Sequence, residues 1–348
     1  MPRPTLATPP GVDNELRDWL YRNAIHDGRP SLTAALAVAT QITRHGVHPG
    51  EGGTGGYFTT LITAGFVDAT LARVIEPHLD ANAILHQASM SPVIPPICAD
   101  ADSSWGVYAA NAATHRLEAH HDAAGWTLSG TKPWCSLAGF VSHAIITAEV
   151  AGAGARAFAV RLDSDRVEAL PGQWVSRGLA EVVSTGIRLD RLAAVPVGDT
   201  NWYLDRPGFS WGAIGVAAVW FGIALGLLDD VKRGISHREA DQIAFAQIGA
   251  ADHELFAAQV CLQHAAVEID AGLATGEAGE LLSLRVRAVV ARSAQKMLTL
   301  AGQALGPGPM TSNESHARRI ADLTVYLRQH HGDRDLARLG EFCRDADR

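Results

Sequence analysis

The chain has 348 residues, of which 47% are hydrophobic and 19% are charged, and its formal net charge is −8. This length allows two or three packed regions with a large core, and the low charge content excludes long disordered segments. The negative balance excludes the basic surface that nucleic-acid binding requires.

The four cysteines are far apart in the sequence and form no C-x-x-C pair. This spacing argues against a disulfide framework or a zinc site, so we expect no metal and a reducing, cytoplasmic setting. No apolar signal-peptide segment follows Met1.

One segment, from Phe209 to Leu228, carries no charge over about 20 residues, which is long enough to cross a membrane. It is rich in Gly and Ala and stands alone. We therefore interpret it as a buried helix of a soluble bundle and expect no membrane association.

The N-terminal third is predicted to be helical. Asp13 and Ser31 are suitable N-caps for two helices, and Gly46 ends the second. Apolar residues at helical spacing resume from Leu61 towards Leu85, and Pro77 is expected to break or kink that helix.

The pattern then changes to short β-like segments separated by Gly or Asp turns. The expected strands are 106–110, 116–120, 126–129, 143–150, 156–162 and 187–190. The second and third of these should form a hairpin around Asp122–Gly125.

From Phe209 onward the pattern is helical again, near 209–235, 241–275, 278–305 and 315–329. The sequence thus predicts an α+β fold with an N-terminal helical domain (1–90), a middle β-domain (91–200) and a C-terminal four-helix bundle (201–348).

This order resembles that of the acyl-CoA dehydrogenase family, a group of flavoproteins. The stretch from Trp126 to Ser136 resembles the family's G-W-x-L-x-G-x-K-x-W-I-T motif, which implies that Trp134 and Ser136 contact a flavin ring. The segment Trp105-Gly106-Val107-Tyr108 is similar to the family's first flavin-contacting strand, so Trp105, Val107 and Tyr108 are further candidates. The family's Glu-Pro-Gly-Ala-Gly loop after that strand is replaced here by residues 109–113.

Matches in the C-terminal half imply that the cofactor is FAD. Gln247 corresponds to a glutamine that helps to hold the cofactor across a subunit interface. The segment Gln303–Gly308, with Gly306, resembles the Q-x-x-G-G-x-G motif that meets the adenine-diphosphate half of FAD in a neighbouring subunit. The resemblance therefore implies a homodimer or homotetramer.

The catalytic base of the family is missing. Family members place a glutamate either near the start of the first bundle helix or just past an R-D-A-x-I-Y helix, which Arg318–Tyr326 resembles. The corresponding residues are Gly212 and His330, or His331 after a one-residue shift. An imidazole can act as a base near pH 7, so His330 and His331 are the catalytic candidates, although both also suit a solvated helix end.

The leading interpretation is an FAD-dependent oxidoreductase of acyl-CoA dehydrogenase type that acts on the CH–CH group of an acyl thioester or a related small substrate, with an electron-transfer partner. One alternative is a flavin-dependent monooxygenase on the same fold, supplied with reduced flavin by a reductase. Another is a non-catalytic, flavin-poor subunit of a heteromer.

Overall fold

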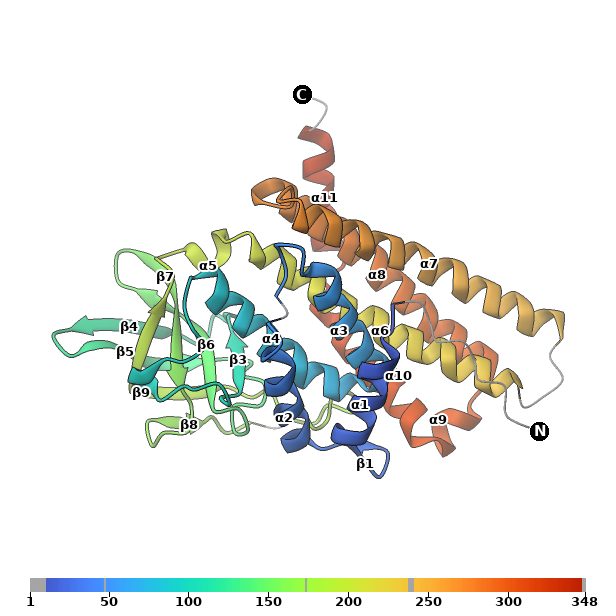
Figure 1. Ribbon diagram of the computed structural model, residues 1–348, viewed down its shortest axis with the longest axis horizontal. Helices are drawn as coiled ribbons and strands as arrows, with labels where there is room; N and C mark the ends of the chain where they lie inside the picture. Colours follow the sequence, from blue (N-terminus) through green and yellow to red (C-terminus); the bar gives the residue numbers. More distant parts are fainter. Residues whose placement is uncertain (1–10, 47, 173, 237–240, 346–348) are drawn as a thin grey trace.

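Three regions follow one another along the chain in the computed structural model, which describes all residues except 1–10, 47, 173, 237–240 and 346–348. A helical N-terminal region is followed by a β-domain and then by long helices. Figure 1 shows the β-domain at one end, with the long helices extending away from it. The α+β order predicted from the sequence is confirmed.

The first helices begin at the residues expected to cap them. The Asp13 side chain accepts a hydrogen bond from Leu16 N, and the Ser31 side chain accepts one from Ala34 N. The elements of this region are α1 (Asn14–Ala24), β1 (Ile25–His26), β2 (Arg29–Pro30), α2 (Leu32–Thr43), α3 (Thr54–Val67) and α4 (Ala69–Gln87).

The predicted break at Pro77 is wrong. Pro77 lies inside α4, and the interruption comes earlier, at Asp68. The backbone of Asp68 is extended, and its side chain accepts a hydrogen bond from Leu71 N. One residue therefore ends α3 and caps α4, which a proline-based expectation does not capture.

The β-domain is a barrel-like sheet with strand order β3-β6-β4-β5-β9-β7. Strand β6 also pairs with β7, which closes the order, and β8 pairs with β9. Asp122 lies opposite Gly125, so the predicted β4–β5 hairpin is confirmed. The strands are β3 (Trp105–Tyr108), β4 (Leu117–Asp122), β5 (Gly125–Lys132), β6 (His143–Val150), β7 (Gly154–Arg161), β8 (Val167–Ala169) and β9 (Ile187–Val197), and a 3-10 turn, η1, spans Pro95–Ile97.

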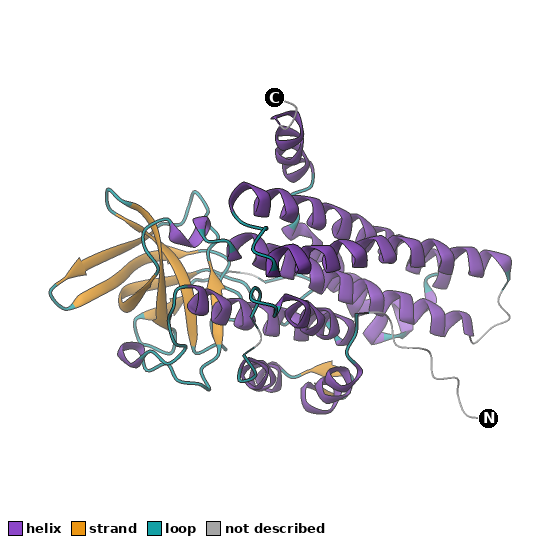
Figure 2. Ribbon diagram, turned by 45° about the horizontal axis from the view of Figure 1, so that its top comes forward, coloured by secondary structure: helices purple, strands orange, loops and turns teal. Residues whose placement is uncertain are grey.

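The C-terminal region consists of helices, of which the longest lie side by side (Figure 2). All four predicted helices are present, and α11 is an addition that the sequence analysis missed. The elements are α5 (Trp202–Asp205), α6 (Gly208–Ser236), α7 (Gln242–Asp270), α8 (Gly276–Leu305), α9 (Gly308–Ser312), α10 (Glu314–Tyr326), the 3-10 turn η2 (Leu327–Gln329) and α11 (Asp333–Asp345).

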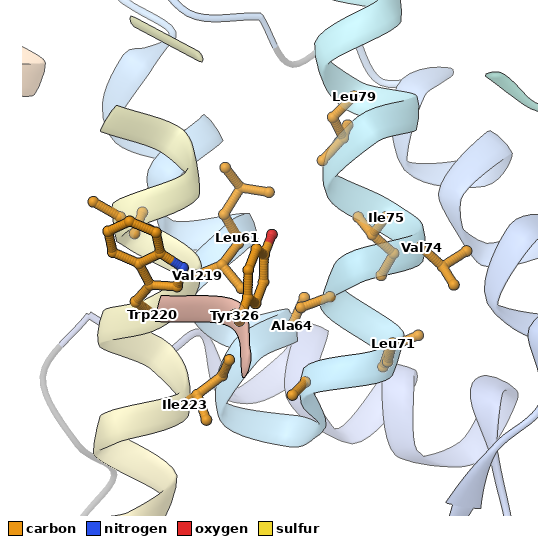
Figure 3. Close-up of a cluster of buried hydrophobic side chains, with 14 of the residues drawn as sticks. Leu61, Ala64, Leu71, Val74, Ile75, Leu79, Val219, Trp220, Ile223 and Tyr326 are labelled. Atoms are coloured by element: carbon orange, nitrogen blue, oxygen red, sulfur yellow. The ribbon is translucent and has the colours of Figure 1, made fainter. Parts of the chain in front are cut away.

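Helix α6 is the centre of the core. Its apolar stretch is long enough to cross a membrane, but 78% of that stretch is buried by the other helices. A Cβ atom on Gly222 would lie 2.1 Å from the Ile62 carbonyl oxygen, so α3 and α6 touch backbone to backbone at this glycine. Figure 3 shows the surrounding cluster, in which Trp220 of α6 and Leu61 of α3 lie near Tyr326 of α10. The structure therefore agrees with a core helix.

A buried group of charges joins α6 to α10. The Asp230 carboxylate is 2.7 Å from Arg319 Nη1 and 2.9 Å from His316 Nδ1. Arg319 Nη2 also donates to the carbonyl oxygen of Phe66 at the end of α3. Burial alone would raise the pKa of Asp230, but the hydrogen bond from His316 and the charge of Arg319 outweigh it and lower the pKa to about 2.

Candidate functional site

The loop after β5 exposes a tryptophan in a strained backbone conformation. Trp134 has a φ of 56°, in the left-handed region that bulky residues avoid, and 61% of the residue is exposed. The loop is held by backbone hydrogen bonds from Cys135 N to Thr185 O and from Leu137 N to Val183 O. The buried side chains of Cys135 and Leu137 anchor the loop, so the indole ring of Trp134 remains exposed at the surface and available for stacking.

Ser136, two residues further on, has a free acceptor. The Ser184 hydroxyl donates to Val182 O, so the Ser136 hydroxyl donates to Ser184 Oγ at 2.8 Å. One of its two lone pairs accepts a hydrogen bond from Arg73 Nη2 at 3.4 Å, and the second has no partner among the described residues. Ser136 and Arg73 thus offer an acceptor and a donor side by side, which suits the polar edge of a planar heterocycle.

The three candidates on β3 lie beneath the surface of the β-domain, and one of them, Tyr108, holds the loop by a hydrogen bond. Trp105 and Tyr108 are buried, Val107 is half-buried, and the Tyr108 hydroxyl donates to the Ser136 carbonyl oxygen at 2.9 Å. Tyr108 therefore positions Ser136, and neither large side chain of β3 is available at the surface.

The remaining cofactor candidates lie elsewhere in the chain. Gln247 is half-buried on α7, Gln303 is exposed near the end of α8, and Gly306 and Gly308 follow it. Figure 1 shows the end of α8 and α9 far from the β-domain that carries Trp134. One copy of the chain does not bring the two predicted halves of the cofactor site together.

A pocket of about 760 Å³ opens between the helices next to the β-domain. Its lining mixes apolar side chains with several carboxylates, in contrast to the wholly apolar core beside it. Residues with ionisable or hydroxyl groups in the lining are Glu76, Asp80, Tyr203, Asp205, Arg206, Ser210, Glu280, Ser283, Arg287, His331 and Asp335.

Two of these carboxylates come from α4 and were missed by the sequence analysis. Burial raises the pKa of both Glu76 and Asp80, while Arg73 beside Glu76 and Arg206 beside Asp80 oppose that rise. Glu76 Oε2 is 3.0 Å from Arg73 Nη1 and accepts a hydrogen bond from the Tyr326 hydroxyl at 3.3 Å. The signal that could have found them is the polar spacing i, i+3, i+7 of Arg73, Glu76 and Asp80 within an apolar helix.

The two histidine candidates occupy different environments. His331 is exposed at the pocket wall, and its Nδ1 is 3.2 Å from Asp335 Oδ1. His330 Nδ1 accepts a hydrogen bond from Gly332 N, which places the proton of the neutral ring on Nε2. Nε2 is buried without a hydrogen-bond partner in the described structure and lies 3.8 Å from Asp335 Oδ2. Burial lowers the pKa of His330, so the ring is neutral near pH 7.

Several solved structures share this architecture and align with almost the whole chain. The TdsC complex with FMN and indole from Paenibacillus sp. A11-2 is 16% identical with a TM-score of 0.75, covering 94% of each chain. The glutaryl-CoA dehydrogenase of Mycobacterium smegmatis is 17% identical with a TM-score of 0.73, covering 90% of this chain and 89% of that one. The chain has the acyl-CoA dehydrogenase fold.

Another protein with this fold is KijD3, in complex with FMN and an amino-keto sugar nucleotide, at 20% identity and a TM-score of 0.69, covering 92% of this chain and 90% of that one. No family model and no curated protein sequence matches the chain. Acyl-CoA dehydrogenase-fold proteins thus include a dehydrogenase and, in TdsC, a dibenzothiophene monooxygenase, so the fold by itself does not choose the reaction.

Proposed function

We propose that this protein is a flavin-dependent oxidoreductase that oxidises a small substrate in the pocket between α4, α6 and α8. The observation that carries the proposal is Trp134, an exposed indole held at positive φ next to the free acceptor of Ser136. A strained, exposed aromatic residue is costly unless it has a function, and a flat cofactor that stacks on it supplies one.

The cofactor we propose is FAD, shared between two copies of the chain. Trp134 and Ser136 would hold the ring end, with the buried side chains of β3 supporting them, and Gln247, Gln303, Gly306 and Gly308 of a neighbouring copy would hold the adenine end. A stripe of exposed apolar side chains on α7, made of Phe245, Phe256, Val260 and Val267, supports a homodimer or homotetramer, because such stripes mark protein contacts.

A bound flavin supplies a hydride acceptor, and the chain supplies the rest. The pocket would receive the substrate, and Arg206 and Arg287 in its lining offer charged hydrogen-bond donors for a carbonyl or carboxylate. Dehydrogenation of the CH–CH group of an acyl thioester or a related small molecule is the leading reaction, and it requires an electron-transfer partner to reoxidise the cofactor.

A second candidate is a flavin-dependent monooxygenase supplied with reduced flavin by a reductase. Two observations favour it: His330 has a buried Nε2–H that makes no hydrogen bond among the described residues, and neither His330 nor Gly212 provides a carboxylate. A buried donor of this kind suits an oxygen-bearing group.

The experiment that tests the proposal is an absorption spectrum of the purified protein before and after incubation with FAD or FMN. We expect a flavin spectrum, preferentially with FAD, and an increase in Tm. A protein that stays colourless at millimolar FAD and FMN would contradict the proposal and favour a non-catalytic subunit of a heteromer. Oxygen consumption with supplied reduced flavin separates the monooxygenase from the dehydrogenase.

A further inference from the structure

Gly212 leaves room for a carboxylate that comes from another helix. A Cβ atom built on Gly212 would lie 2.9 Å from Asp80 Oδ1. Any side chain at position 212 would therefore compete with the Asp80 carboxylate for the same space. The Asp80 carboxylate of α4 thus occupies the space beside the α6 backbone that a side chain at position 212 would fill.

The Asp80 carboxylate is open to the pocket. Its side chain retains 17% of its exposure and lines the cavity, and within the described part of the chain it accepts no hydrogen bond. Its nearest cation is Arg206, whose Nη2 is 4.0 Å away and whose Nη1 donates to Gln87 instead. A carboxylate that is desolvated, unbonded and accessible is a stronger proton acceptor than one that is already hydrogen-bonded.

The ionisable side chains next to Asp80 come from α3, α4, α5 and the segment after α5. Glu76 lies one turn earlier on α4, Tyr57 faces it from α3, and Tyr203 and Arg206 face it from α5 and the segment that follows. Of these only Arg206 is cationic and favours the charged carboxylate, whereas the neighbouring Glu76 carboxylate disfavours a second negative charge.

Most other ionisable groups in and beside the pocket are engaged. Glu76 is bound by Arg73 and Tyr326, and the His331 ring is paired with Asp335. The free nitrogen of His330 carries a proton and is a donor. Among the described carboxylates of the lining, Asp80 and Asp205 accept no side-chain hydrogen bond, and of these two Asp205 is exposed to solvent whereas Asp80 is largely buried in the cavity.

We propose that Asp80 is the general base of this pocket, with its carboxylate in the space that Gly212 leaves open. The proposal rests on the proposed flavin oxidoreductase function. Asp80 takes the proton from the carbon next to the substrate carbonyl. The electron pair of that C–H bond would form the new C=C bond, and a bound flavin would accept the hydride that leaves the neighbouring carbon. One proton on Asp80 and two electrons with one proton on the flavin then account for the two hydrogens removed from the substrate.

The first experiment measures proton removal without turnover. Butyryl-CoA and glutaryl-CoA are incubated with the FAD-treated protein in D₂O without an electron acceptor, and deuterium at the α-carbon is measured by mass spectrometry. Anaerobic bleaching of the bound flavin is followed in parallel. We expect Asp80→Asn to lower both rates by ~10²–10⁴-fold while the flavin absorption and affinity stay at the wild-type level.

The second experiment moves the acid from one helix to the other. Asp80→Ala should lose exchange, and the double variant Asp80→Ala/Gly212→Asp should recover at least about ten-fold of it, because a carboxylate then enters the same space from α6. Asp229→Asn is the matched control, since Asp229 has a similar exposure on α6, pairs with Arg233 and lies outside the pocket. It should exchange like the wild type.

The outcomes separate this proposal from the proposed function. Failure to take up flavin overturns the proposed function. A protein that binds flavin but shows α-exchange unaffected by Asp80→Asn, or no exchange with either thioester, overturns the role of Asp80 alone. Loss of exchange in His331→Ala with retention in Asp80→Asn would return the base to the histidine expected from the sequence.

Discussion

The buried charge group that joins α6 to α10 should be a main determinant of stability. We consider Asp230→Asn, which removes one negative charge and keeps the shape of the side chain. Arg319 is almost completely buried, and Asp230 is the carboxylate paired with it at 2.7 Å. The variant therefore leaves a buried guanidinium without a counter-charge.

The size of the effect follows from the pKa of Asp230. The difference between 3.8 and about 2 corresponds to about 2 kcal/mol of native-state stability at neutral pH, at about 1.4 kcal/mol per pH unit. Breaking a buried pair from one side typically costs about 3–5 kcal/mol, because the remaining charge is uncompensated. The Asn side chain can still accept a hydrogen bond, so we expect a loss of about 3 kcal/mol in the free energy of unfolding.

The assay is urea denaturation at pH 7, followed by circular dichroism, with Asp229→Asn as the control. Asp229 lies next to Asp230 on α6 but pairs with the half-exposed Arg233 at 3.0 Å, so its variant should lose less than about 1 kcal/mol. Because the folded pKa of Asp230 is below its unfolded value, the stabilisation is present above pH ~4 and is lost as the pH falls towards about 2. The difference between wild type and Asp230→Asn should shrink over that range. Equal losses in the two variants at pH 7 would refute this account.

Three further predictions concern the cofactor site, the core and the assembly. Trp134→Ala should weaken FAD binding by about ten-fold or more through loss of stacking, measured by flavin fluorescence titration, and an unchanged affinity would exclude Trp134 from the site. Gly222→Ala should lower the free energy of unfolding by about 2 kcal/mol or more, because its Cβ would meet the Ile62 carbonyl; a neutral result in thermal denaturation would mean that α3 and α6 can separate at no cost. Phe256→Glu should shift the protein towards monomer in light scattering, and a wild type that is already monomeric would contradict the shared site.

Local signals in the sequence predicted most of the fold. The caps at Asp13 and Ser31 and the hairpin at Asp122–Gly125 depend on residues close in sequence, so they could be identified directly. Strand β8 has three residues, which is too short for a pattern to identify it. Helix α11 does carry a helical pattern, since Leu336, Leu339 and Phe342 recur at helical spacing, and the sequence analysis overlooked it among the surrounding charges. Pro77 misled the prediction because α4 continues through it to Gln87, and the boundary between α3 and α4 is set instead by the cap at Asp68.

The candidate site divides in the same way. Trp134 and Ser136 belong to one contiguous motif, and the structure places the exposed indole of Trp134 close in the chain to the half-buried hydroxyl of Ser136. Their contact with a cofactor stays a prediction, as do the roles of His330 and His331. Asp80 could not be found by looking for a carboxylate at positions 212 and 330. Which side chain fills the space beside Gly212 is decided by the packing of α4 against α6, and that relation joins residues more than a hundred positions apart.

The separation between Trp134 and the end of α8 has a genetic consequence. If two copies complete each cofactor site, a Trp134→Ala chain and a chain altered at Gln303 are each inactive alone for different reasons. In a mixed dimer one of the two sites combines both defects, while the other is built entirely from intact residues. Co-expression of the two damaged chains should therefore restore part of the flavin binding that neither has by itself, a case of complementation between alleles of one gene.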